Sequence, residues 1–162
     1  MEISVDPYIL ILSPTNSIVR LREREGKKRA IDLTLNAISL YNLLSVANST
    51  KTDRPIIHKL MVNALSVLGS AIEKVVVDNI IDGLFHSHIY LKRDGQVHLI
   101  DAHVTDAIGL AIVQRCPLLV LEDVFAKSAE EQARRRLGIQ RMSDEEELKM
   151  LQDIDPDKLL KC

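Results

Sequence analysis

Four side chains that could bind a metal ion or carry a proton are spaced so that one hairpin would bring them together. Asp94-Gly95 is a typical two-residue hairpin turn, and counting outward from it pairs His88 with Asp101 and His86 with His103. Since alternate residues of a strand share a face, we expect all four on one face, with opposed Cβ atoms about 5 Å apart. Three imidazoles and a carboxylate suit zinc or another divalent transition ion, which could polarise a phosphodiester and activate water.

The same residues have other interpretations. Without a metal, two imidazoles could act as acid and base on the 2′-hydroxyl group of RNA. The histidines could also be polar surface residues, or they could form hydrogen bonds across a dimer interface. His86, His88 and His103 are the candidate metal ligands, and the cofactor remains open beyond a divalent metal.

Three polar residues form the candidate catalytic set. His58 falls in the first turn of a predicted helix, beside an apolar stripe, where it could instead bond a carbonyl or stay exposed. Asp106 lies near a helix start and could simply cap it. Asp101 lies between an apolar strand and that helix start. If it is buried there, it needs a basic group or a metal as partner, because an unpaired buried charge is costly.

Hydrophobic periodicity predicts the elements that position these residues. Alternating or continuous apolar runs predict strands at 3–12 (one bent strand or two short ones), 17–25, 27–33, 73–80, 84–91, 96–102 and 117–123. A 3.6-residue period predicts helices from Asn36, from about Arg54 to Leu68, and from Thr105 or Asp106 to about Gln114. Ser-x-x-Glu capping boxes at Ser128 and Ser143 predict two further charged helices.

An internal repeat relates two parts of the chain. Gly26 precedes Asp32 by six residues, as Gly95 precedes Asp101, and each segment continues into an Ala-Ile-x-Leu helix start. Each half would be a hairpin followed by a helix, which favours an α+β fold with a largely antiparallel sheet. If Asp32 and Asp101 both brace a helix start, their role is structural rather than catalytic.

Composition and charge set the broad class. The 162 residues have 46% hydrophobic content and a net charge of -2, which fits one globular domain and does not indicate a nucleic-acid binder by bulk charge. A basic segment spans Arg20 to Arg29, and an acidic segment spans Ser143 to Lys158. Both segments could be solvated surface. Alternatively, the basic segment could bind phosphate or the acidic tail of a neighbouring chain.

We expect a main domain at 1–127 and a charged helical tail at 128–162. Cys116 and Cys162 are interpreted as free thiols, and without a predicted signal peptide or membrane span the expected location is the cytoplasm.

Several motifs resemble the bifunctional nuclease domain family. The segments RPIIHKLM at 54–61, DGLFHSHIYL at 82–91 and IDAHVTDAIGLAI at 100–112 are similar to the family's Arg-Pro-x-Thr-His-Asp, Asp-Gly-x-Phe and Ile-Asp-Ala-Arg-Pro-Ser-Asp-Ala-Ile-Ala-Leu patterns. PLLVLEDVFAKSA at 117–129 and the acidic end of the chain are also similar. His58, Asp101 and Asp106 are the identical polar positions, whereas Ser39 stands where the family usually has Glu.

The resemblance implies an α+β fold of two strand-rich repeats, each followed by helices, around one curved, barrel-like, mostly antiparallel or mixed sheet. It also implies a homodimer and cleavage of DNA or RNA. On this basis the candidate catalytic residues are Asp101, Asp106 and His58, and the candidate phosphate contacts are Arg20, Arg22 and Arg24.

Two other functions stay open. The absence of the family glutamate at Ser39 favours a non-catalytic dimeric binding or regulatory module that keeps the fold. A small-ligand or protein-interaction role is the third alternative.

Overall fold

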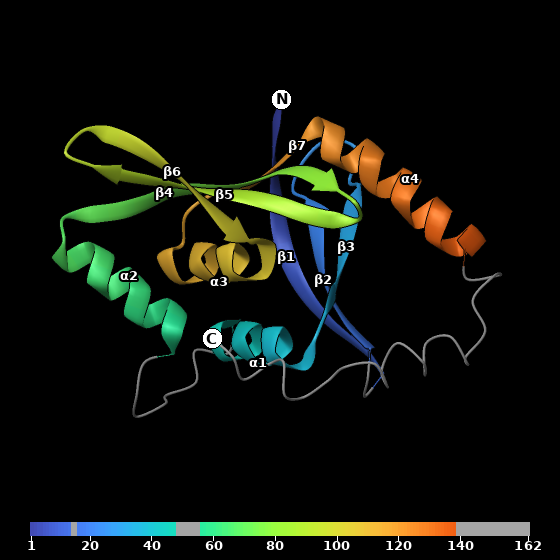
Figure 1. Ribbon diagram of the computed structural model, residues 1–162, viewed down its shortest axis with the longest axis horizontal. Coiled ribbons are helices and arrows are strands. Elements are labelled where there is room, and N and C mark those ends of the chain that lie inside the picture. The colour runs from blue at the N-terminus through green and yellow to red at the C-terminus, as the bar shows by residue number, and fades with distance from the viewer. Residues whose placement is uncertain (14–15, 48–55, 139–162) are drawn as a thin grey trace, which may run out of the picture. The chain divides into compact units, whose positions relative to one another are not determined.

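The computed structural model describes residues 1–13, 16–47 and 56–138, which form seven strands and four helices (Figure 1). The strands are β1 (Glu2–Ser13), β2 (Asn16–Glu23), β3 (Ala30–Leu35), β4 (Ser70–Ile81), β5 (Leu84–Arg93), β6 (Gln96–His103) and β7 (Leu118–Leu121). The helices are α1 (Ala37–Ala47), α2 (Ile57–Val67), α3 (Val104–Gln114) and α4 (Glu122–Gly138). The residues up to Ser128 form one compact unit, to which all contacts below belong.

The strands form one mixed, open sheet in the order β3-β2-β1-β7-β4-β5-β6. All neighbouring pairs are antiparallel except β4 and β7, which are parallel. The α+β class is confirmed, but the expected barrel-like sheet is wrong. A barrel requires its first and last strands to pair, and among the described strands β3 and β6 are instead two free edges.

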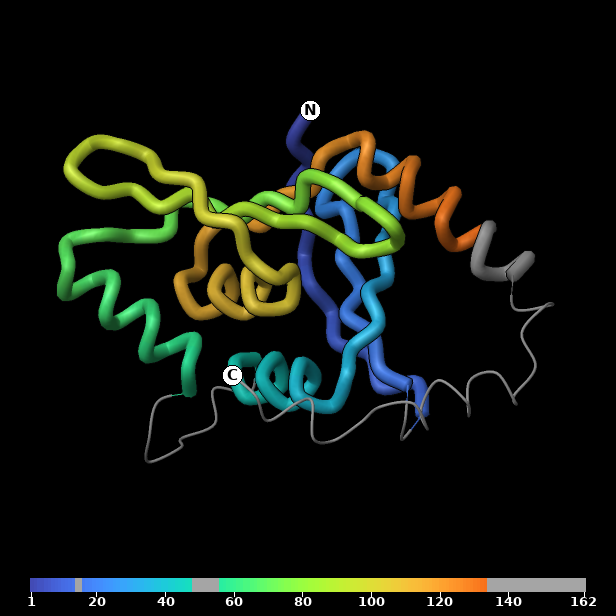
Figure 2. The backbone as a smooth tube through the Cα atoms, in the orientation of Figure 1, coloured from blue at the N-terminus to red at the C-terminus, as the bar shows by residue number. Residues whose placement is uncertain are grey.

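The predicted repeat is visible in the element order. Three antiparallel strands followed by a helix occur as β1-β2-β3-α1 and again as β4-β5-β6-α3, with α2 between them. β7 then lies between β1 and β4 at the centre of the sheet and joins the two repeats. Figure 2 shows the path of the backbone through both halves.

One face of the sheet carries the core. Cross-strand register places Val75, Ile89 and Ile100 in one row and Val77, Ser87 and Ala102 in the next, all on the side covered by α3. α3 packs against α1, α2 and strands β4 to β6, and most of its residues from Val104 to Ala111 are buried. The core is aliphatic, as the near absence of aromatic residues requires, and each fully buried Leu, Ile or Val side chain contributes roughly 1.5–3 kcal/mol.

The structure decides several local expectations. Of the two alternatives for residues 3–12, one strand or two, it shows the single strand Glu2–Ser13. α3 begins at Val104 with His103 at its N-cap position, and no side chain caps it, so capping by Thr105 or Asp106 is wrong. α4 begins at Glu122 rather than at Ser128, which is buried within that helix. Asn36, at the predicted start of the first helix, caps α1, because its Oδ1 accepts a hydrogen bond from the Ser39 amide at 2.8 Å.

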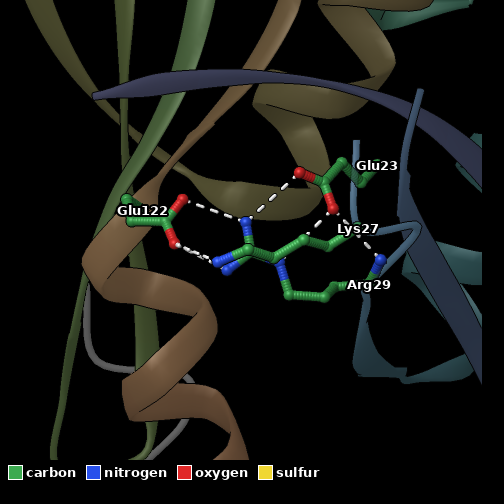
Figure 3. A network of polar contacts seen from close by, with 4 residues as sticks. All are labelled: Glu23, Lys27, Arg29 and Glu122. Atoms are coloured by element: carbon green, nitrogen blue, oxygen red, sulfur yellow. Dashed lines mark hydrogen bonds and ion pairs between the residues drawn. The ribbon is translucent and has the colours of Figure 1, made fainter. Parts of the chain in front are cut away.

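A network of ion pairs connects the first turn of α4 to the β2–β3 hairpin (Figure 3). The Arg29 guanidinium donates to Glu122 at 2.7 and 2.9 Å and to the largely buried Glu23 at 3.2 Å. It also lies 4.4 Å from the centre of the Phe125 ring, a cation–π distance. Hydrogen bonds from Arg29 lower the pKa of both Glu23 and Glu122.

None of the helices within the described residues is long and apolar enough to cross a membrane. The acidic segment from Ser143, and Arg54 before α2, lie outside the described residues. The proposed boundary between a main domain at 1–127 and a tail at 128–162 therefore stays a prediction.

Candidate functional site

A cavity of about 490 Å³ lies between α2, α3 and the inner face of β4 to β6. Most of its wall is aliphatic, from residues such as Met61 and Leu65 of α2 and Ile89 and Leu91 of β5. The polar residues lining it are His58, Asp101, His103 and Asp106. Asp101 lies between the inward-facing Ile100 and Ala102, so its carboxylate points to the opposite face of β6, as His88 does on β5. The three candidate catalytic residues, which come from α2, β6 and α3, therefore line one cavity.

His58 is the most unusual residue of this cavity. Its side chain is only 3% exposed, and neither ring nitrogen has a hydrogen-bond partner within the described parts of the chain. Its Nε2 lies 3.5 Å from Oδ1 of Asp106, but the approach is not aligned as a hydrogen bond. A buried polar group without a partner costs about 1–3 kcal/mol, so the ring is placed to accept a partner from the cavity.

A glycine on α3 creates the space for this ring. A Cβ atom on Gly109 would lie 2.7 Å from both Cδ2 and Nε2 of His58. On α2, Val62 and Leu65 pack against the core, and His58, one turn before Val62, lies on the same side of the helix. Gly109 lets its ring lie against the α3 backbone. No local sequence pattern predicts this contact, because it joins residues of two helices that lie far apart in the chain.

His103 is held at the junction of β6 and α3. Its Nδ1 lies 2.9 Å from Oγ1 of Thr105, and the same hydroxyl lies 3.4 Å from Oγ of Ser39 on α1. The Thr105 contact leaves Nε2 of His103 available for another partner. Ser39, which stands at the position of the family glutamate, is therefore a near neighbour of the site, and Thr105 is a site residue that the sequence reasoning missed.

The predicted hairpin register is confirmed, because His86 pairs with His103 and His88 with Asp101. Yet Ile89 lines the cavity, so alternation places His86 and His88 on the opposite face of β5. There Nδ1 of His88 contacts Oδ2 of Asp78 on β4. Across the described ranges, no group of three or more His, Cys, Asp or Glu residues is arranged to hold a metal ion, so the structure does not assemble His86, His88 and His103 into one donor set.

The two repeat-related aspartates differ in their surroundings. Asp32 on β3 accepts two hydrogen bonds from Arg20, from Nε and Nη2, both at 2.7 Å. Asp101 is exposed and has no hydrogen bond or ion pair with any other described residue. Asp101 therefore does not need the basic or metal partner that a buried carboxylate would require, and the ion pair that holds Asp32 is not repeated at Asp101.

The three candidate phosphate contacts are not equivalent. Arg20 is paired with Asp32, and Arg24 is paired with Asp6 at 2.6 Å. Arg22 is exposed and, among the residues that the structure describes, has no hydrogen-bond or ion-pair partner. Only Arg22 can therefore meet a phosphate without giving up an existing partner.

The architecture and the cavity define an α+β protein of two β-β-β-α repeats, with a polar site where the second repeat meets α2. The chain matches the bifunctional nuclease domain over residues 19–133, and it belongs to that family. The matched segment contains every residue that lines the cavity. No curated protein shows significant similarity to the chain.

Proposed function

We propose that this protein is a nuclease that cleaves phosphodiester bonds of nucleic acid at the cavity lined by His58, Asp106 and His103. The observation that carries the proposal is the buried His58 ring, whose nitrogens have no hydrogen-bond partner among the described residues and whose Nε2 lies 3.5 Å from the Asp106 carboxylate. A carboxylate beside an imidazole can orient the ring and stabilise the imidazolium formed when the ring takes up a proton.

RNA is the substrate to which this geometry is best suited. His58 would take the proton of a 2′-hydroxyl, whose oxygen attacks the adjacent phosphorus. His103, protonated at Nε2, would give its proton to the departing 5′-oxygen, which leaves a 2′,3′-cyclic phosphate and a free 5′-hydroxyl. The Thr105 hydroxyl, 2.9 Å from Nδ1 of His103, would hold that ring in place.

The test is cleavage of single-stranded RNA and DNA with Mg²⁺, Mn²⁺, Zn²⁺ or chelator. His58→Gln should lower the rate of RNA cleavage about 100-fold or more, as loss of a general base does. His88→Gln is the matched control, because His88 lies on the opposite face of the sheet. Unchanged cleavage in His58→Gln would contradict the site assignment, whereas dependence on added metal would favour metal-activated water over a two-histidine mechanism.

A non-catalytic binding module is the second candidate, and the charge of the cavity favours it. Its described lining includes the carboxylate of Asp106 but no lysine or arginine. Such a lining repels a phosphate group unless a histidine is protonated. Salt-sensitive binding of nucleic acid without cleavage under any of the metal conditions would support this candidate.

We also propose that the protein is a homodimer. The support from the structure is a set of large apolar side chains exposed on α1 and α2, including Tyr41 at 67%, Leu60 at 51% and Met61 at 46%. Exposed apolar surface of this kind is typical of interaction sites. Light scattering coupled to size exclusion should give twice the 18.2 kDa chain mass, and Tyr41→Glu with Leu60→Glu should shift the protein towards the monomer.

A further inference from the structure

We propose that the cavity is a binding site for a small organic cation, namely a primary amine with an aliphatic or aromatic body. The inference goes beyond nuclease activity and does not depend on it. Its first support is size and lining, because a cavity of about 490 Å³ with a mostly aliphatic wall is in the range of small-molecule sites. Water gains few hydrogen bonds against Met61, Leu65, Ile89 and Leu91, so an apolar body displaces it favourably.

The polar residues of the cavity determine which head group it would take. The Asp106 carboxylate contributes acceptors only, and a neutral His58 ring contributes one acceptor nitrogen. A primary ammonium group has three N–H donors and no acceptor, so it matches this pair. A carboxylate or phosphate ligand would meet the negative charge of Asp106 and, in the described lining, no lysine or arginine.

His58 gives a second and independent indication of a ligand. It is 3% exposed, lines the cavity and has no hydrogen-bond partner among the described residues. Asp106, whose side chain is 59% exposed, lies 3.5 Å from it. An ammonium group at this place would donate a hydrogen bond to the buried imidazole, and its positive charge would be balanced by the Asp106 carboxylate. Bound there, it would also prevent a nucleic-acid substrate from reaching His58.

The test is isothermal titration calorimetry of the full chain with three probes of equal length: octylammonium, octanol and octanoate. Octylammonium should bind with a stoichiometry of one per chain and at least tenfold more tightly than octanoate. Asp106→Asn, a change at a largely exposed side chain, should reduce the preference for octylammonium over octanol at least threefold. Equal affinity for all three probes would overturn the proposal.

A pair of matched variants localises the binding. Ala102→Phe places a large ring in the cavity that Ala102 lines, whereas Ala71→Phe adds the same ring on an exposed part of β4. Octylammonium affinity should fall at least tenfold in Ala102→Phe and stay unchanged in Ala71→Phe, with circular dichroism confirming that both variants are folded. If Ala102→Phe does not fold, His58→Leu combined with Asp106→Asn replaces it, and retention of the full ammonium preference in that variant would overturn the proposal. Since no nucleic acid is present, failure here leaves the nuclease proposal to its own assay.

Discussion

The imidazole of His58 lies directly on Gly109, so close that a Cβ atom there would be 2.7 Å from two ring atoms. We therefore predict that Gly109→Ala destabilises the protein. Alanine favours a helix over glycine by about 1 kcal/mol, but displacing a packed ring costs typically 1–3 kcal/mol. Denaturant unfolding should show a net loss of stability, together with weaker octylammonium binding.

A double-mutant cycle separates this contact from general damage to α3. In a His58→Ala background the clash is absent, so Gly109→Ala should become neutral or stabilising. The coupling between the two positions should be about 1 kcal/mol or more. Additive effects of the two substitutions would show that the ring does not rest on Gly109.

The two repeat-related aspartates should respond differently to the same substitution. Asp32→Asn weakens two charge-assisted hydrogen bonds from Arg20, so it should lower the midpoint of urea unfolding. Asp101→Asn should change stability by less than about 0.5 kcal/mol, as expected at an exposed site without partners. A larger loss of stability for Asp101→Asn than for Asp32→Asn would contradict the finding that Asp32 is paired with Arg20 while Asp101 is exposed and has no partner among the described residues.

The Arg29 network should make stability depend on pH. Arg29 holds the pKa of Glu23 and of Glu122 below the ordinary value of 4.5. Groups whose pKa is lowered by folding stabilise the protein above their unfolded pKa, and that contribution is lost as the pH falls through the folded pKa. The free energy of unfolding should therefore decline from about pH 5 downward.

Arg29→Met tests the origin of this decline. Methionine keeps an apolar contact with Phe125 but removes the charge, so the variant should be less stable than the wild type at pH 7. The difference should shrink as the pH falls below the ordinary glutamate range and the two carboxylates take up protons. A difference that stays constant over this range would assign the loss to packing rather than to the ion pairs.

Arg22 should contribute most of the three arginines to nucleic-acid binding. A phosphate contact by a lysine or arginine on a single strand contributes about 0.7 to the slope of log K against log salt. Arg22→Ala should reduce that slope by about this amount for single-stranded RNA. Arg20→Ala should reduce it less, because Arg20 is already paired with Asp32; equal effects would indicate that the pair opens on binding.

How far the site could be predicted depended on the range of the interactions involved. Turn chemistry at Asp94-Gly95 and strand alternation are local, so the register that opposes His88 and Asp101 was predictable. Which face of that hairpin is covered depends on where α3 packs. Since α3 covers the face that carries Ile89, the side chains of His86 and His88 lie on the other face, away from the cavity. The absence of barrel closure likewise reflects pairing between strands that lie far apart in the sequence.

The sequence by itself determined that a hairpin followed by a helix occurs twice, the register of the second hairpin and membership of the family, because these follow from local periodicity and from short motifs. Only the tertiary structure decided that His58 is buried against Gly109, that Asp101 is exposed while Asp32 is paired, and that His58, Asp101, His103 and Asp106 line one aliphatic cavity. The physical reason is that burial and pairing depend on which side chains of distant segments meet when α2 and α3 pack on the sheet, and no local pattern encodes those contacts.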